Sequence, residues 1–386
     1  MTESQQQQRR ARILLIGSGR MGQIRMAHLH ANPRFQVCGV VDVNLAGAQK
    51  LAGKYFVPSF SSLTEAIDYY SNGSILMTAL KPTTEDIASV ASTDVSVASA
   101  SDGGDNTNKA GGGIGSATTS LDAILISTPT FTHAGLIEEA IRSKLAIFTE
   151  KPVDETADKI IELFEKCAAA KIPLACGFQR RFDPSYVALR EAIRRNQIGK
   201  PLMANIFFGD YPCPPIEFLL KGGNLWMDLL CHDADFIRWC LDDEVESVYA
   251  TGTSSVPQLE KAGVHDNGTV LLKFKKGAVV TVSMSRSAAY GYDQRCEVFG
   301  ELGHVEVGNH NLTSTVLSDR NGVHGSTLQP GFKQRFSEAF AAELDAFADV
   351  VLDGAVWPIL ARDCVAAQEM ADAANTSCKE GRPITF

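Results

Sequence analysis

Three glycines close to the N-terminus constrain the fold of this chain more than any other feature. Gly17, Gly19 and Gly22 follow the apolar run from Ile13 to Ile16 and open a segment that is expected to be a helix. A strand, a tight glycine turn and a helix in this order are typical of a dinucleotide-binding unit, in which the pyrophosphate lies at the helix N-terminus. The alternative is a tight turn that binds no nucleotide.

An acidic residue ends the next apolar segment, as the dinucleotide interpretation requires. Asp42 closes the segment FQVCGVVD, 23 residues after Gly19. Its carboxylate would accept hydrogen bonds from both hydroxyls of an adenosine ribose, and its charge would repel a 2′-phosphate. Asn44 beside it is neutral, and no arginine follows to bind such a phosphate. The sequence therefore predicts NAD as the cofactor in preference to NADP.

The first half of the chain alternates apolar strands with amphipathic helices. Further strands are expected in DAILISTPT, LAIFTEKP and IPLACGFQRRF, with helices in HAGLIEEAIRSK and ETADKIIELFEKCAAAK between them. This alternation predicts an α/β fold with a doubly wound parallel sheet. Residues 12–178 are interpreted as an NAD-binding Rossmann domain, and the polar residues 1–11 as a disordered tail.

Residues 71–120 interrupt this alternation. Thirty of these fifty residues are Ser, Gly, Ala or Thr, and none is aromatic. Such a composition cannot bury enough apolar surface to offset the entropy of ordering the segment. We predict a low-complexity insertion that loops out of the first domain; a binding role for it is the alternative.

From residue 179 onward the pattern changes to alternating, β-branched segments that are separated by turns. GTVLLKFKKGAVVTVSMSRSA and RCEVFGELGHVEVGN are the clearest examples. They predict a large, mainly antiparallel open sheet with one polar face. Two helical stretches at 333–353 and 359–380 close the chain, so residues 179–386 are expected to form a second, α+β domain.

Composition excludes several classes of protein. The net charge of −9 disfavours a protein that binds nucleic acid or an anionic membrane surface. No run approaches the roughly 20 apolar residues of a membrane span, and MTESQQQQRRAR lacks the apolar stretch of a signal peptide. The nine cysteines contain no C-x-x-C pair, so we expect reduced thiols and a cytoplasmic protein.

A histidine surrounded by acids is the second chemical feature. The segment GGNLWMDLLCHDADF places His232 near Asp228, Asp233 and Asp235. On a helix, positions 228, 232 and 235 share one face. That face could hold a metal ion, a proton-transfer pair or a solvated charge cluster. No motif with ligand spacing supplies further metal ligands, so no metal is expected.

Lys151 ends one of the predicted strands, where doubly wound sheets bind ligands, although an isolated lysine there is usually only solvated. With the glycine turn, the segments STPTFTH, TEKP, GFQRRFD, GGNLWMDLLCHDADFIRW and YGYDQRCEVFGELG follow in order. In these segments the chain resembles the Gfo/Idh/MocA oxidoreductase family, and within it the inositol 2-dehydrogenase-like members. The resemblance covers nearly everything except the tail and residues 71–120.

The resemblance implies NAD-dependent oxidation of a secondary alcohol on a cyclic polyol or sugar. Lys151, Asp228 and His232 match the catalytic residues of the family, and the Lys151–Pro152 peptide bond is often cis there. His232 would take the hydroxyl proton, Lys151 would steady the developing alkoxide, and Asp228 would orient the imidazole. Asp233 and Asp235 are interpreted as structural, capping a helix or pairing with Arg238.

The resemblance also implies which residues contact the two ligands. The cofactor-binding set is Gly17, Gly19, Arg20, Met21, Gly22, Asp42, Thr128, Pro129, Thr130, His133, Glu150 and Lys151. The substrate-binding set is Lys151, Arg180, Asp210, Asp228, His232 and Tyr292. A homodimer or homotetramer, formed by pairing of the second-domain sheets, is expected for the same reason.

The chain departs from inositol-type members after the segment GKPL. Those members usually carry a basic residue where this chain has Phe208, Gly209 and Asp210. A missing donor would alter selectivity, so weaker use of myo-inositol is expected unless Arg180 or a water fills the gap. Two other functions stay open: a sugar oxidoreductase of the same family, and an NAD-binding regulatory protein without turnover.

Overall fold

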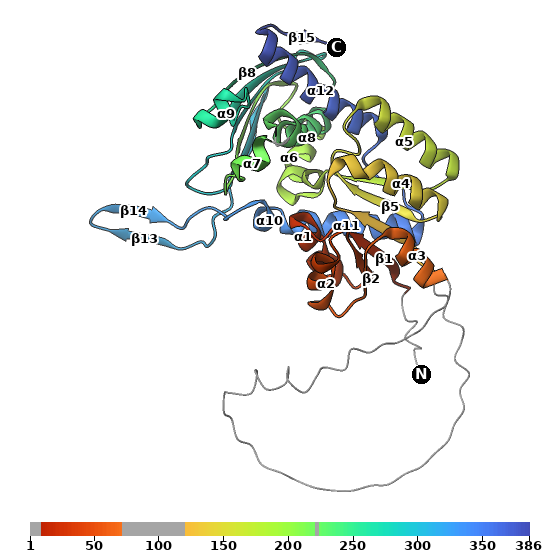
Figure 1. Cartoon of the computed structure of the whole chain (residues 1–386). Coiled ribbons are helices and arrows are strands. Elements are labelled where there is room, and N and C mark those ends of the chain that lie inside the picture. The colour runs from red at the N-terminus through yellow and green to blue at the C-terminus, as the bar shows by residue number, and fades with distance from the viewer. Residues whose placement is uncertain (1–8, 72–119, 221–223) are drawn as a thin grey trace, which may run out of the picture.

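The computed structural model describes residues 9–71, 120–220 and 224–386, and two sheets dominate it (Figure 1). The first sheet has six parallel strands in the order β3-β2-β1-β4-β5-β6. They are β1 (Ala11–Ile16), β2 (Phe35–Val41), β3 (Ser59–Phe60), β4 (Ala123–Ile126), β5 (Ala146–Glu150) and β6 (Leu174–Gly177). The predicted doubly wound parallel sheet is confirmed.

Helices follow most of these strands. They are α1 (Arg20–Ala31), α2 (Leu45–Gly53), α3 (Leu63–Ser71), the 3₁₀ turn η1 (Thr130–Thr132), α4 (His133–Arg142) and α5 (Ala157–Ala170). β1 begins at Ala11, one residue inside the predicted tail, because the Ala11 N–H donates to the Arg34 carbonyl at 2.8 Å. Of the predicted insertion, residues 72–119 lie outside the described part of the chain.

The core of the first domain includes residues from the end of the chain. The apolar runs of β1 and β4 are buried throughout, as expected for parallel strands that are covered on both faces. Leu344 and Phe347 of helix α11 (Ser337–Asp353) join this core, followed by Trp357. The Phe347 ring lies 5.4 Å from Phe148 of β5. The chain therefore returns to the first domain after building the second.

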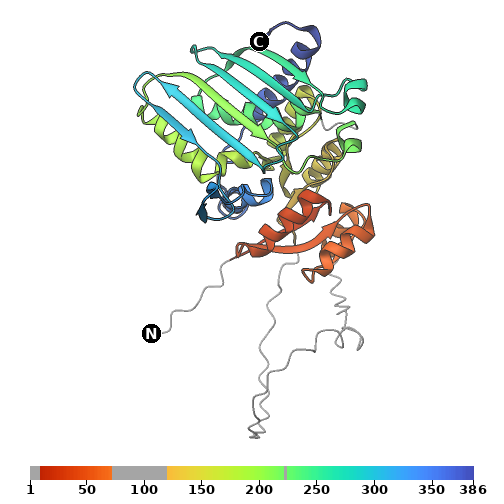
Figure 2. The same cartoon turned by 90° about the vertical axis from the view of Figure 1, so that its left-hand side faces the viewer.

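The second sheet has seven strands in the order β12-β11-β7-β10-β9-β8-β15, and β7 and β10 are its one parallel pair among the described residues. They are β7 (Pro201–Gly209), β8 (Val245–Thr253), β9 (Asn267–Phe274), β10 (Val279–Ser285), β11 (Asp293–Gly300), β12 (His304–Val307) and β15 (Ile384–Thr385). The predicted large, mainly antiparallel sheet is confirmed. Figure 2 shows one face of it open, with helices behind the other face.

The helices of the second half connect its strands or close the chain. They are the 3₁₀ turn η2 (Gln179–Phe182), α6 (Pro184–Arg194), α7 (Ile216–Leu220), the π turn η3 (Trp226–Leu230), α8 (Cys231–Leu241), α9 (Pro257–Lys261), α10 (Phe332–Arg335) and α12 (Ala361–Glu380). A hairpin of β13 (Val316–Asp319) and β14 (Gly322–Gly325) projects from the body (Figure 1). In the described parts of the chain, no helix combines the length and apolar character needed to cross a membrane.

Candidate active site

Each glycine of the turn after β1 serves a different purpose. Gly17 has φ +102°, and a Cβ on it would lie 2.8 Å from the Ser127 carbonyl oxygen. A Cβ on Gly22 would lie 2.0 Å from the Gly17 carbonyl oxygen, so only glycine lets α1 pack this closely. A Cβ on Gly19 would meet no atom within 4 Å, and that exposed space is open to a ligand.

The N-terminus of α1 is available to an anion. Its N-cap is Gly19, which makes no side-chain capping bond, and its first turn carries no acidic residue. Unpartnered N–H groups and the helix dipole favour a phosphate at such a position. This geometry fits the pyrophosphate of a dinucleotide. The Arg20 guanidinium carbon lies 4.4 Å from the centre of the Phe332 ring, and Met21 packs against the hydrophobic core of the second domain. Both side chains therefore contact the second domain.

Asp42 lies at the end of β2, beside the glycine turn. Its Oδ2 accepts from the Ser18 N–H and from the Ser18 hydroxyl, both at 2.7 Å, and its Oδ1 accepts from the Asn44 N–H at 2.8 Å. Burial works to raise the pKa of Asp42, but the bonds from Ser18 and Asn44 outweigh it and lower that pKa. The carboxylate is therefore ionised and partly exposed, which is the state required to bind a ribose diol.

The loop after β4 is joined to both neighbouring segments. Thr128 and Thr132 share a hydrogen bond of 2.7 Å between their hydroxyls, and Thr132 also donates to the Pro129 carbonyl at 2.8 Å. His133 is 1% exposed, with one ring nitrogen 2.9 Å from the Thr128 carbonyl and the other 3.0 Å from that of Pro152. His133 therefore holds two loops together, and its contact with a cofactor stays a prediction. Contacts of Thr128, Pro129 and Thr130 with the ribose stay a prediction.

Glu150 has a protein partner that the sequence did not indicate. Its carboxylate accepts from Nε of Arg25, a fully buried residue of α1, whose Nη1 lies 2.7 Å from Glu343 of α11. Burial raises the pKa of Glu343 to about 7, with Arg25 opposing the rise and Glu150 adding to it. Glu150 thus belongs to an ion-pair group that joins three elements, and its contact with a ribose stays a prediction.

Lys151 and Asp228 form the centre of the site. The Lys151–Pro152 peptide bond is cis, as the resemblance implied. The Lys151 ammonium donates to Oδ1 of Asp228 at 3.0 Å and to the Asp228 carbonyl at 2.8 Å. Burial works to lower the pKa of Lys151, but Cys231 and Asp228 raise it, so the amine is charged. Burial works to raise the pKa of Asp228, whereas Lys151 and Arg286 bring it well below its usual range.

His232 is the second residue of α8, which directly follows the π turn that carries Asp228. Burial lowers the pKa of His232 well below its usual value, Lys151 and Arg180 lower it further, and Asp228 opposes them. The imidazole is therefore neutral at neutral pH, as a general base must be. Its buried Nδ1 has no hydrogen-bond partner among the described residues.

The predicted role of Asp228 in orienting His232 is not what the structure shows. Both carboxylate oxygens of Asp228 bind cations, Lys151 and Arg286, and no hydrogen bond to His232 is found in the described chain. The physical reason is the π turn at Trp226–Leu230, which breaks the α-helical spacing that placed positions 228, 232 and 235 on one face. Asp235, farther along α8, is buried against Arg181.

Arg286 is the residue of this site that the sequence analysis missed. It follows β10 and is 1% exposed, with Nη1 3.1 Å from Asp210 and Nη2 2.8 Å from Asp228. Burial raises the pKa of Asp210, and Arg286 opposes that rise. A charged residue directly after an apolar, alternating strand was the available signal. A basic residue thus does lie beside Asp210, but it is buried in ion pairs with Asp210 and Asp228, so weaker use of myo-inositol stays a prediction.

Two predicted substrate contacts are buried side chains. Arg180 is 1% exposed; it pairs with Asp233 and donates to Gln294 at 2.9 Å, because that carboxylate is its nearest buried counter-charge. Arg180 thus has protein partners, and its contact with substrate stays a prediction. Asp233 pairs with Arg180 and not with Arg238. Tyr292 is 3% exposed, with Phe208 and Phe336 rings around it, and its contact with substrate stays a prediction.

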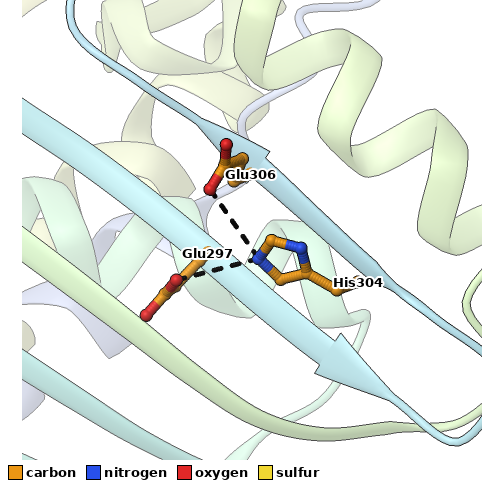
Figure 3. Close-up of side chains that lie close together, drawn as sticks. All are labelled: Glu297, His304 and Glu306. Atoms are coloured by element: carbon orange, nitrogen blue, oxygen red, sulfur yellow. Dashed lines mark ion pairs between the residues drawn. The ribbon is translucent and has the colours of Figure 1, made fainter.

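A possible set of metal ligands lies elsewhere. Within the described residues, Glu297, His304 and Glu306 come together on β11 and β12 (Figure 3). The His304 Nε2 lies 3.7 Å from Glu297 and 3.9 Å from Glu306. All three side chains are more than a third exposed, and the group does not include His232. The acidic surroundings of His232 are thus explained by ion pairs with Lys151, Arg180, Arg181 and Arg286.

Comparison with known proteins agrees with this geometry. Residues 11–96 and 115–178 match the profile described as "Oxidoreductase family, NAD-binding Rossmann fold", and residues 186–306 match the "GFO/IDH/MocA C-terminal domain". An inositol 2-dehydrogenase of Rhizobium meliloti is 37% identical over 69% of this chain and 81% of its own length.

Two further proteins resemble this chain, one in sequence and one in both sequence and fold. A scyllo-inositol 2-dehydrogenase (NAD(+)) of Bacillus subtilis is 34% identical over 68% of this chain and 77% of its own. The crystal structure of a putative myo-inositol dehydrogenase from Sinorhizobium meliloti superimposes with a TM-score of 0.80 at 30% identity, covering 97% of this chain and 99% of that one. The first domain is thus an NAD-binding Rossmann domain, as the sequence predicted.

Proposed function

Because the chain belongs to the GFO/IDH/MocA oxidoreductase family, we propose that it catalyses the reversible NAD-dependent oxidation of a secondary hydroxyl on an inositol-type cyclic polyol. One observation carries the proposal. The charged ammonium of Lys151 forms an ion pair with the ionised carboxylate of Asp228, and the neutral imidazole of His232 lies beside them. The names of the inositol dehydrogenase relatives support the substrate class.

The residues of the site divide the chemistry between them. His232 accepts the proton of the substrate hydroxyl, for which a neutral imidazole is required. Lys151 donates a hydrogen bond to the same oxygen and stabilises the alkoxide as charge develops. Bound NAD⁺ supplies the acceptor for the hydride that leaves the carbinol carbon. Asp228 keeps Lys151 charged and in place, and its partly exposed carboxylate can accept from a neighbouring hydroxyl.

The test is a polyol panel followed by NADH absorbance. Myo-, scyllo- and chiro-inositol, glucose and xylose would each be mixed with NAD⁺ and the purified protein. We expect oxidation of at least one inositol, and loss of that activity in His232→Ala but not in His324→Ala, which removes an exposed histidine of the β13–β14 hairpin. Oxidation of glucose or xylose alone would favour a sugar oxidoreductase. NAD⁺ binding without any turnover would favour a regulatory protein.

We also propose a homo-oligomer formed through the open face of the second sheet. Exposed apolar side chains lie on four adjacent strands of it, namely Leu202, Met203, Tyr249, Leu271 and Val279. Leu271→Asp should shift the mass measured by light scattering towards the monomer, whereas Leu302→Asp, at an exposed turn, should not. A cytoplasmic location is supported by the nine cysteines, all of which are free thiols.

A further inference from the structure

Arg286 and Asp210 reach the site from neighbouring parallel strands. Ser285, the last residue of β10, is in register with Gly209, the last residue of β7. Because β7 and β10 run parallel, their carboxyl ends lie at one edge of the sheet and the next residues leave it side by side. The Asp210 N–H donates to the Ser285 carbonyl at 2.7 Å and fixes this arrangement.

The guanidinium of Arg286 binds two carboxylates with separate N–H groups. Nη1 lies 3.1 Å from Oδ2 of Asp210, and Nη2 lies 2.8 Å from Oδ2 of Asp228. The Arg286 side chain is 1% exposed, whereas that of Asp228 is 34% exposed. A substrate can therefore reach Asp228 but not Arg286, so Arg286 acts on the reaction through the carboxylates that it binds.

The four side chains Asp210, Arg286, Asp228 and Lys151 form a row of alternating charge. Oδ1 of Asp228 binds Lys151 and Oδ2 binds Arg286, so the two cations fix the carboxylate in orientation from both sides. Without Arg286, Asp210 would lose this ion pair and Asp228 would keep only the one with Lys151. Asp228 could then rotate, and Lys151 would follow it away from the reacting oxygen.

We propose that Arg286 is a positioning residue of the reaction, which fixes Asp228, and through it Lys151, by bridging Asp228 to Asp210. This proposal rests on the proposed function, because its kinetic test measures the oxidation of a polyol. A planar guanidinium offers two donors at a fixed separation, whereas a lysine ammonium offers a point charge to one carboxylate at a time. The bridge therefore requires arginine and not merely a positive charge.

The experiment compares Arg286→Gln and Arg286→Lys with a matched control, Arg238→Gln. Arg238 is also buried and lies between two carboxylates, 2.7 Å from Glu244 and 3.7 Å from Asp363, in the last turn of α8. Thermal unfolding, kcat, KM and the pH profile would be measured for each variant. We expect Arg286→Gln to lower kcat roughly 100-fold, with little change in KM for NAD⁺. Arg286→Lys should keep the pH profile but lower kcat about tenfold, and Arg238→Gln should lower the unfolding temperature alone.

A second readout does not depend on turnover. The charged groups that act on His232 are Lys151, Arg180 and Asp228. If loss of Arg286 lets Asp228 turn and Lys151 move with it, Lys151 repels a protonated imidazole less strongly. The ¹⁵N resonances of His232, assigned with a His232→Asn variant, should therefore titrate at higher pH in Arg286→Gln and not in Arg238→Gln.

These measurements separate the two proposals. If the wild-type protein oxidises no polyol, the proposed function fails, while the His232 titration still tests the bridge. Wild-type kcat in Arg286→Lys, an unshifted His232 titration in Arg286→Gln, or a loss of kcat that Arg238→Gln reproduces at every pH would each overturn the positioning role.

Discussion

Replacement of Asp42 by alanine should weaken NAD⁺ binding by an amount that the structure allows us to estimate. An ionised carboxylate has about four lone-pair positions, and the bonds from Ser18 and Asn44 occupy three of them. About one position is left for the ribose diol. The expected loss is therefore that of one charged hydrogen bond, about 1.5–3 kcal/mol, or roughly a 10- to 150-fold increase in Kd.

Calorimetric titration with NAD⁺ and NADP⁺ would measure this effect. The control is Ser18→Ala, which removes one neutral donor to Asp42 from the free and the NAD⁺-bound protein alike and should change NAD⁺ binding less than Asp42→Ala does. Asp42→Ala should also lessen the discrimination against NADP⁺, because the charge that repels a 2′-phosphate is gone. An alanine variant that binds NAD⁺ within twofold of the wild type, or a wild type that binds both cofactors equally, would refute the reasoning.

Three further predictions concern pH and the insertion. The rate of oxidation should rise with pH as His232 loses its proton, at a pH below about 6.5, the ordinary pKa of histidine, because the pKa of His232 is lowered. His232→Ala should lower the rate roughly 10²–10⁴-fold. If the rate of that variant depends on pH as in the wild type, another residue is the base. Glu343 has a raised pKa of about 7, so its contribution to stability is complete below about 4.5 and is lost as the pH rises through 7. The unfolding temperature of the wild type relative to Glu343→Gln should fall from pH 5 to pH 8, and a constant difference would contradict this. Replacing residues 72–119 by a short Gly-Ser linker should preserve folding and NAD⁺ binding, because the entropy of closing a loop changes only slowly with its length. Insoluble protein, or loss of NAD⁺ binding, would contradict this prediction.

The parts of the site that the sequence predicted are those encoded by contiguous residues. The glycine turn, Asp42 and Lys151 each follow a strand that its own apolar run reveals, and the parallel sheet brings the ends of such strands together. Local pattern and tertiary position agree for these residues, so the fold of the first domain followed directly.

The parts that the sequence did not predict depend on non-local geometry. Arg286 meets Asp210 because β7 and β10 pair in parallel, which no sequence pattern revealed in a mainly antiparallel sheet. Arg180 and Arg181 follow each other in the chain, yet each has its own buried aspartate, and only packing decides which arginine faces which acid. The π turn before His232 has more residues per turn than an α-helix, so Asp228 does not lie on the helical face that the sequence predicted for it and His232.

The return of α11 to the first domain affects the order in which this protein can fold as it is synthesised. Phe347 and Trp357 complete an aromatic cluster with Phe148, and Glu343 completes the ion pairs of Arg25. All strands of the first sheet have been synthesised once residue 177 is added, whereas the core continues to Ala367. At a typical rate of synthesis this interval is roughly 10–40 s. During that time the first domain has its sheet but lacks part of its core, so the nascent chain exposes apolar surface that a chaperone can bind.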